Sequence, residues 1–86
     1  MTKYRFVPSN KVCSKEMIFV IDENNRIESL EVIGGCHGNL QGIGRLIKGM
    51  DIEEVIARLE GVDCRGRGTS CPDQIAIGLK QYLAQQ

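Results

Sequence analysis

The feature that most constrains the fold is a pair of β-rich runs joined by a short polar turn. Residues 16–21 (EMIFVI) and 27–33 (IESLEVI) flank the polar residues 22–25 (DENN). Two such runs joined by a polar turn are typical of an antiparallel hairpin. A further short strand is predicted over residues 4–7, where Pro8 ends it.

After Gly34 and Gly35, which stop the second long strand, the apolar pattern changes to helical spacing. The spacing predicts a helix with Asn39 as its N-cap and Gly49 as its stop. Two glycines inside it, at positions 42 and 44, each cost about 1 kcal/mol relative to alanine, which favours close backbone packing there or an irregular first turn.

Two more helices are predicted downstream. One begins at Asp51, which forms a capping-box-like start with Glu54, and ends at Gly61. The other follows residues 62–69 and has a capping-box-like start at Ser70, with Pro72 in its first turn.

This order of elements predicts an α+β fold. A small antiparallel sheet of about three strands is followed by about three helices packed on it. A length of 86 residues favours a single domain over residues 1–86 with a modest core. Small domains of this kind are often reinforced by a metal, a disulfide or a partner chain.

Charge and hydropathy exclude several classes of partner. The net charge is zero, which argues against a nucleic-acid or acidic-membrane partner. No apolar run reaches the roughly 18 residues that a membrane span needs, and the N-terminal residues have no signal-peptide core. We therefore expect a cytoplasmic protein, in which four cysteines indicate metal or redox chemistry more than disulfides.

The cysteines fall at the ends of predicted elements. Cys13 precedes the first long strand, Cys36 lies between the second and a helix, and Cys71 lies in the first turn of the last helix. Cys64 lies in the Gly/Arg-rich loop before that helix. A thiol near a helix N-terminus is favoured as the thiolate, which ligates metals or attacks electrophiles. His37, the one histidine, is a possible nitrogen ligand.

The spacing alone leaves alternatives open. The gaps are longer than those of zinc ribbons, and small buried cysteines are common in cores. A nucleophilic Cys71 with Cys64 as its resolving thiol, with Arg65 and Arg67 adding positive charge, is a second hypothesis. The glycine-rich residues 34–44 are compatible with anion or nucleotide binding but fit neither phosphate-loop fingerprint.

Residues 69–74 (TSCPDQ), preceded by a cysteine-glycine loop and by residues 36–49 (CHGNLQGIGRLIKG), resemble the TSCPD domain family over nearly the whole chain. That family includes small stand-alone proteins and a domain attached to vitamin B12-dependent ribonucleotide reductases. The resemblance implies an accessory role in ribonucleotide reduction and deoxyribonucleotide synthesis for DNA replication. The label ribonucleoside-diphosphate reductase, often given to small members, does not transfer as an activity, because 86 residues cannot supply the radical site and large barrel.

The chain also resembles iron–sulfur scaffold proteins of the IscU/NifU type over residues 13–86. In both, a cysteine precedes a hairpin, a Gly-Cys follows it, and a third cysteine opens a late helix. Lys15 and Ser70 depart from that pattern, where the scaffolds have aspartate and histidine. The likeness implies that three cysteines meet at one end of the domain, with Cys64 or His37 as the fourth ligand of zinc or an iron–sulfur cluster. A sulfur-transfer protein is the alternative partner to a ribonucleotide reductase. The full predicted ligand set is Cys13, Cys36, His37, Cys64 and Cys71.

Overall fold

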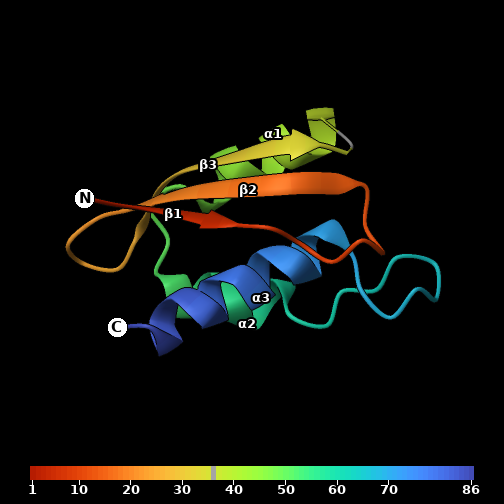
Figure 1. Ribbon diagram of the computed structural model, residues 1–86. Coiled ribbons are helices and arrows are strands. Elements are labelled where there is room, and N and C mark those ends of the chain that lie inside the picture. Colours follow the sequence, from red (N-terminus) through yellow and green to blue (C-terminus); the bar gives the residue numbers. More distant parts are fainter. Residues whose placement is uncertain (36) are drawn as a thin grey trace.

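Three antiparallel strands form one sheet, in the order β1 (Thr2–Phe6), β2 (Ser14–Ile21) and β3 (Ile27–Gly34) (Figure 1). The computed structural model describes residues 1–35 and 37–86. For His37 it describes the backbone but not the side chain. The predicted hairpin is confirmed as β2 and β3, whose register pairs Phe19 with Leu30. The first strand pairs with β2 and begins and ends slightly earlier than predicted.

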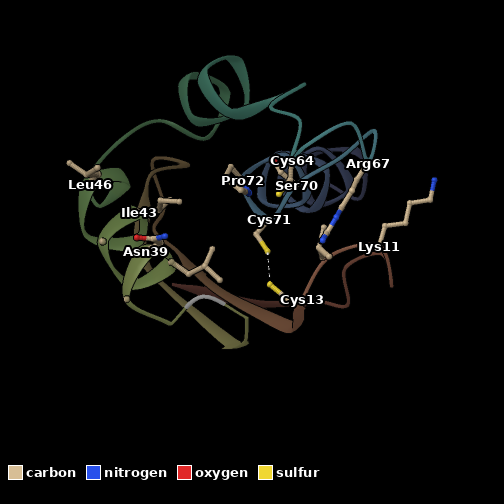
Figure 2. A pocket seen from close by; sticks show the side chains of 14 residues that line it. Lys11, Cys13, Asn39, Ile43, Leu46, Cys64, Arg67, Ser70, Cys71 and Pro72 are labelled. Carbon is tan, nitrogen blue, oxygen red and sulfur yellow. Dashed lines mark hydrogen bonds between the residues drawn. The ribbon is translucent and has the colours of Figure 1, made fainter.

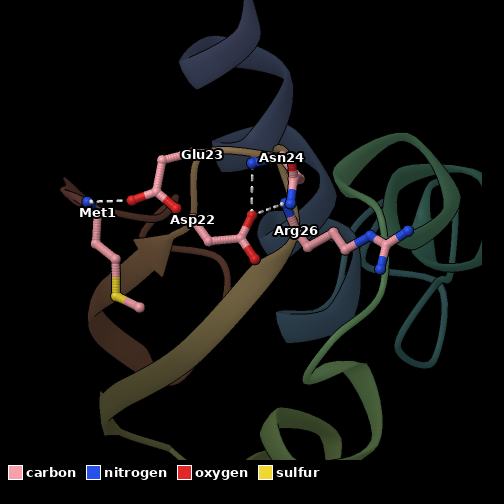
Figure 3. Close-up of polar contacts among 5 residues, drawn as sticks. All are labelled: Met1, Asp22, Glu23, Asn24 and Arg26. Carbon is pink, nitrogen blue, oxygen red and sulfur yellow. Dashed lines mark hydrogen bonds and ion pairs between the residues drawn. The ribbon is translucent and has the colours of Figure 1, made fainter.

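The turn between β2 and β3 is closed by one aspartate. The Asp22 carboxylate accepts hydrogen bonds from the backbone N–H groups of Asn24 and Arg26, at 2.9 and 3.0 Å (Figure 3). Asn25 has a φ of 57°, a left-handed conformation that asparagine adopts more readily than most residues. The Glu23 carboxylate forms an ion pair with the N-terminal ammonium of Met1 at 3.3 Å. The polar residues 22–25 therefore form the turn through their own side chains.

Three helices follow the sheet: α1 (His37–Ile47), α2 (Ile52–Leu59) and α3 (Cys71–Ala84). The α+β prediction is confirmed. One predicted helix start was wrong, and one was right without its predicted side-chain bond. Asn39 lies inside α1, because Gly34 and Gly35 have positive φ and turn the chain directly after β3. Asp51 is the N-cap of α2, as predicted, but its carboxylate makes no capping bond and lies 3.7 Å from the Arg26 guanidinium instead.

The core lies between one face of the sheet and the helices. Met17, Phe19 and Ile21 alternate along β2 and are fully buried. The helical side of the core comes mainly from α2 and α3, through Ile52, Val55, Ile56, Ile75, Ala76, Leu79 and Tyr82.

Two glycines allow helices to approach the sheet closely. A Cβ at Gly78 of α3 would lie 2.9 Å from the Phe6 ring, and one at Gly44 of α1 would lie 3.1 Å from the Leu30 carbonyl oxygen. The close packing predicted for the first helix is therefore confirmed at Gly44. It is wrong at Gly42, where a Cβ would meet no atom within 4 Å.

The fold brings the start of β2, the end of β3 and the start of α3 to one end of the domain, and both chain termini lie at the other end (Figure 1). Among the helices of the described residues, none has the length and apolar character needed to cross a membrane. The start of β2, the end of β3 and the start of α3 thus lie at the same end of the domain.

Candidate functional site

Two cysteines that lie 58 residues apart in the sequence meet at this end of the domain. Cys13 precedes β2 and Cys71 is the first residue of α3, and their Sγ atoms lie 4.0 Å apart (Figure 2). The Ser14 hydroxyl oxygen lies 3.4 Å from the Cys71 Sγ and shares a hydrogen bond with it. Cys13 is exposed and Cys71 is half-buried, so both sulfurs can be reached from solvent.

The surroundings of Cys71 favour its thiolate. Partial burial raises the pKa of the Cys71 thiol, but hydrogen bonds from the side chains and backbone of Ser14 and Cys13 outweigh it. The net result is a pKa below the ordinary cysteine value. The position of Cys71 at the N-terminus of α3 acts in the same direction, because the free N–H groups there favour a negative charge.

Ser70 caps α3 and also holds the preceding loop. Its hydroxyl accepts a hydrogen bond from the Asp73 backbone N–H at 3.1 Å and donates one to the Val62 carbonyl oxygen at 2.5 Å. The predicted cap at Ser70 is therefore confirmed. Because both hydrogen-bonding roles of the hydroxyl are used, Ser70 has a structural task at the position where the scaffold family carries a histidine.

The Asp73 carboxylate does not return to Ser70, as a complete capping box requires. It accepts hydrogen bonds from the Thr69 hydroxyl at 2.6 Å and from the Gly61 backbone N–H at 2.8 Å. Gln74 donates to the Thr69 hydroxyl at 2.9 Å and accepts from the Ser9 backbone N–H at 3.0 Å. The motif of residues 69–74 therefore ties the start of α3 both to the loop that carries Cys64 and to the segment before Cys13.

The loop that carries Cys64 is closed by a second aspartate. The Asp63 carboxylate accepts from the backbone N–H groups of Gly66 and Gly68, at 2.5 and 2.6 Å. Both glycines have positive φ, of 79° and 83°, which explains their place in a loop this tight. The Arg67 backbone N–H donates to the Cys64 carbonyl oxygen at 3.1 Å, so the loop has a defined conformation around its exposed cysteine.

A cleft of about 530 Å³ opens beside the two sulfurs (Figure 2). One wall is the apolar side of α1. The other wall is formed by the start of α3, the loop before α3 and the loop before β2. The cleft is lined by Lys11, Val12, Cys13, Gly38, Asn39, Leu40, Gly42, Ile43, Leu46, Cys64, Arg67, Ser70, Cys71 and Pro72. Three cysteines thus share one surface depression, and no carboxylate lies among these lining residues.

The end of β3 packs directly against Cys13. Gly35 has a φ of 78°, and a Cβ there would lie 3.2 Å from the Cys13 Sγ, the Leu40 Cδ1 and the Ser14 backbone nitrogen. A side chain at this position would therefore push against the sulfur. The close approach explains why glycine stands directly after β3.

The structure bears on part of the predicted ligand set. It brings Cys13 and Cys71 together and places Cys64 on the same cleft. Cys36 and the side chain of His37 lie outside the described residues. Within the described part of the chain, no three His, Cys, Asp or Glu side chains are arranged to hold a metal ion.

Sequence reasoning missed two polar residues of the site. Ser14 contacts the sulfur of Cys71, and Gln74 links the start of α3 to the segment before Cys13. Ser14 directly follows a cysteine, but nothing local indicates that its partner is 57 residues away. Of the two loop arginines, Arg67 lines the cleft and Arg65 is not among its lining residues.

Comparison with known proteins gave a match to a protein family over most of the chain. Neither the curated proteins nor the solved structures gave a match to this sequence. The TSCPD domain matches residues 1–83, which is nearly the whole chain and includes every residue of the site described above. The protein therefore belongs to the TSCPD domain family.

Proposed function

We propose that this domain binds a metal through cysteine thiolates, as zinc or as an iron–sulfur cluster, with Cys13 and Cys71 as two of the ligands. The distance between their sulfurs carries the proposal. Two thiolates on one tetrahedral zinc, each bonded at about 2.3 Å, lie about 3.8 Å apart. The 4.0 Å separation of Cys13 and Cys71 is close to that value and about twice the length of a disulfide bond, about 2.05 Å.

The other ligands of the proposed set come from the same end of the domain. Cys64 lines the cleft that reaches both sulfurs. Cys36 is proposed from the sequence, and the described residues around it support this, because Gly35 packs on Cys13 and Gly38 lines the cleft. His37 is the alternative nitrogen ligand.

Hydrogen bonds within the chain hold Cys71 in a position where its thiolate can bind a cation. Ser14 hydrogen-bonds the Cys71 sulfur, and the network of Thr69, Asp73 and Gln74 fixes the backbone that carries it. When bound, zinc would add folding stability, whereas an iron–sulfur cluster would add the capacity for one-electron transfer.

The partner that fits this role is a larger enzyme of ribonucleotide reduction or a sulfur-transfer protein. Membership of the TSCPD family supports the first. In this proposal the domain acts as an accessory module to that larger protein.

Purification without chelator under anaerobic conditions tests the metal site. We expect bound zinc or iron by elemental analysis, and brown colour with visible absorbance if the metal is a cluster. Single Cys→Ser variants should separate ligands from bystanders, because loss of a ligand lowers the metal content. A metal-free protein whose four variants all unfold like the parent would contradict the proposal, since structural zinc contributes on the order of 10 kcal/mol.

A second proposed function is a thiol redox or sulfur-transfer protein with Cys71 as the nucleophile. The cleft favours it, because it gives an outside molecule a path to the half-buried Cys71 sulfur, which has another thiol at 4.0 Å. Selective alkylation of Cys71 in metal-free protein tests this function. A Cys71 that reacts no faster than Cys64 would count against it.

A further inference from the structure

We infer that the cleft receives a small disulfide that carries carboxylates, that Cys71 attacks it, and that Cys13 rather than Cys64 resolves the mixed disulfide. This inference rests on the second proposed function and names its substrate class and its resolving thiol. It requires the two sulfurs and the cleft, and it does not require a metal.

The cleft suits a molecule of this size and character. Its volume of about 530 Å³ lies within the range of small-molecule sites, about 300–1,000 Å³. The α1 wall presents Ile43 and Leu46, and Leu46 is 78% exposed, so an apolar surface is available beside the thiols. Such a wall can pack against the methylene groups and peptide planes of a small disulfide such as oxidised glutathione.

The charge of the cleft favours an anion. Lys11 and Arg67 line it, and the lining residues include no aspartate or glutamate. In the described part of the chain neither cation forms an ion pair. Figure 2 shows the Arg67 side chain extending from its loop toward the side of the cleft that carries Cys13. A guanidinium in this position can hold a carboxylate with two parallel hydrogen bonds.

The proposed reaction is two successive thiol–disulfide exchanges. The Cys71 thiolate attacks one sulfur of the substrate, forms a mixed disulfide, and releases one substrate half as a thiolate. The Cys13 thiol then loses its proton to solvent and attacks the Cys71 sulfur, which releases the second half. The released halves take up protons, so one disulfide is reduced to two thiols while Cys13 and Cys71 are oxidised to one disulfide.

The geometry selects Cys13 as the resolving residue. Its sulfur lies 4.0 Å from that of Cys71, so a movement of about 2 Å brings the pair to disulfide length. Between the sulfurs of Cys64 and Cys71 the structure records no contact in the described residues. This pairing differs from the Cys64–Cys71 pair that the sequence suggested.

The first experiment uses the full chain, reduced and treated with chelator, with oxidised glutathione as the probe. Mass spectrometry should find a Cys13–Cys71 disulfide in the parent and in Cys64→Ser. In Cys13→Ser a glutathione adduct should accumulate on Cys71. An adduct that accumulates in Cys64→Ser, or its absence from Cys71 in Cys13→Ser, would overturn the inference.

The second experiment tests the anion preference with a matched pair of variants. Arg67→Gln should slow the reaction with oxidised glutathione by about tenfold and leave that with the uncharged hydroxyethyl disulfide unchanged. Arg65→Gln, in the same loop but not among the lining residues, should slow neither. Equal slowing by both variants, or equal rates with both disulfides in the parent, would overturn the choice of substrate.

The failures can be told apart. If Cys71 is alkylated selectively yet ignores oxidised glutathione, the inference fails and the redox function stands. If Cys71 reacts with neither reagent, both fail together. Metal content is measured independently on untreated protein.

Discussion

At the residue scale, the neighbours of Cys71 act on the charge state of its thiol. Two opposing effects act on the thiol: partial burial raises its pKa, and hydrogen bonds from Ser14 and Cys13 lower it further than burial raises it. The carboxylate of Asp73 fixes the backbone around Cys71, since it accepts hydrogen bonds from Thr69 and Gly61. Ser14 thus favours the thiolate of Cys71, and Asp73 holds the start of α3 in position.

Ser14→Ala should shift the reactivity of Cys71 to higher pH. The serine hydroxyl lowers the pKa of the thiol, so its removal leaves the opposing effect of burial less compensated and raises that pKa. The rate of iodoacetamide alkylation at Cys71, followed by mass spectrometry in metal-free protein, should therefore have a higher midpoint pH. Ser9→Ala is the matched control, because its hydroxyl accepts from the Lys11 backbone and does not contact the sulfur. An identical profile in parent and Ser14→Ala would contradict the assigned role.

Asp73→Ala should destabilise the domain by about 3 kcal/mol, because it leaves a buried hydroxyl and a backbone N–H without their acceptor. Asp51→Ala is the control. Asp51 also lies at the start of a helix, as the N-cap of α2, but its side chain makes no capping bond. Its exposed ion pair with Arg26 is worth less than about 1 kcal/mol. Urea unfolding of both variants measures the difference, and equal losses would argue against the network.

At the element scale, glycines determine how closely the helices and strands approach one another. Gly78 lets α3 rest on the Phe6 ring, and Gly35 lets the end of β3 rest on the Cys13 sulfur. Helix propensity alone would favour alanine at a helical glycine by about 1 kcal/mol. Packing therefore overrides propensity where the neighbouring element is close.

Gly78→Ala and Gly42→Ala should change stability in opposite directions. The Cβ at position 78 would lie 2.9 Å from two atoms of Phe6, so overpacking should cost about 1–3 kcal/mol. The Cβ at position 42 would meet no atom within 4 Å, so the helix should gain up to about 1 kcal/mol. Chemical unfolding of the two variants checks both signs. Stabilisation by both would show that α3 can move away from the sheet without loss.

At the scale of the whole molecule, Cys13 and Cys71 connect the sheet to the last helix across 58 residues of sequence. A metal held by both sulfurs would act as a cross-link between β2 and α3, and it would bind the folded state more tightly than the unfolded chain. The proposed site is therefore also a proposed source of stability for a domain with a modest core.

Zinc should raise the thermal stability of the parent and have little effect on Cys71→Ser. At a free zinc concentration about 1,000 times the Kd, binding adds about 4 kcal/mol to the free energy of unfolding. Thermal unfolding with zinc and with chelator, in both proteins, measures this difference. Equal shifts in the two proteins would place the zinc elsewhere.

The parts of the fold that depend on neighbours in sequence were predictable. The hairpin, the three helices and the cap at Ser70 arise from interactions within a few residues, such as the Asp22 carboxylate with the amides two and four residues on. The helix start at Asn39 was wrong because Gly34 and Gly35 turn the chain sooner than the apolar spacing suggests. The ligand roles of the whole set stay predictions: Cys13, Cys36, His37, Cys64 and Cys71.

What the sequence by itself determined is the set of elements, their order and the position of each cysteine at an element's end, because turn chemistry and hydrophobic period are local properties. The resemblance to the scaffold proteins had implied that Cys71 meets Cys13. The tertiary structure alone decided that Cys71 also contacts Ser14 and has no sulfur contact with Cys64 among the described residues. The physical reason is that the packing of α3 on the sheet and the hydrogen bonds of Gln74 to two separate segments set these distances. Residues 64–74 contain the whole TSCPDQ motif, and the partner of its Cys71, Cys13, lies 58 residues earlier in the chain.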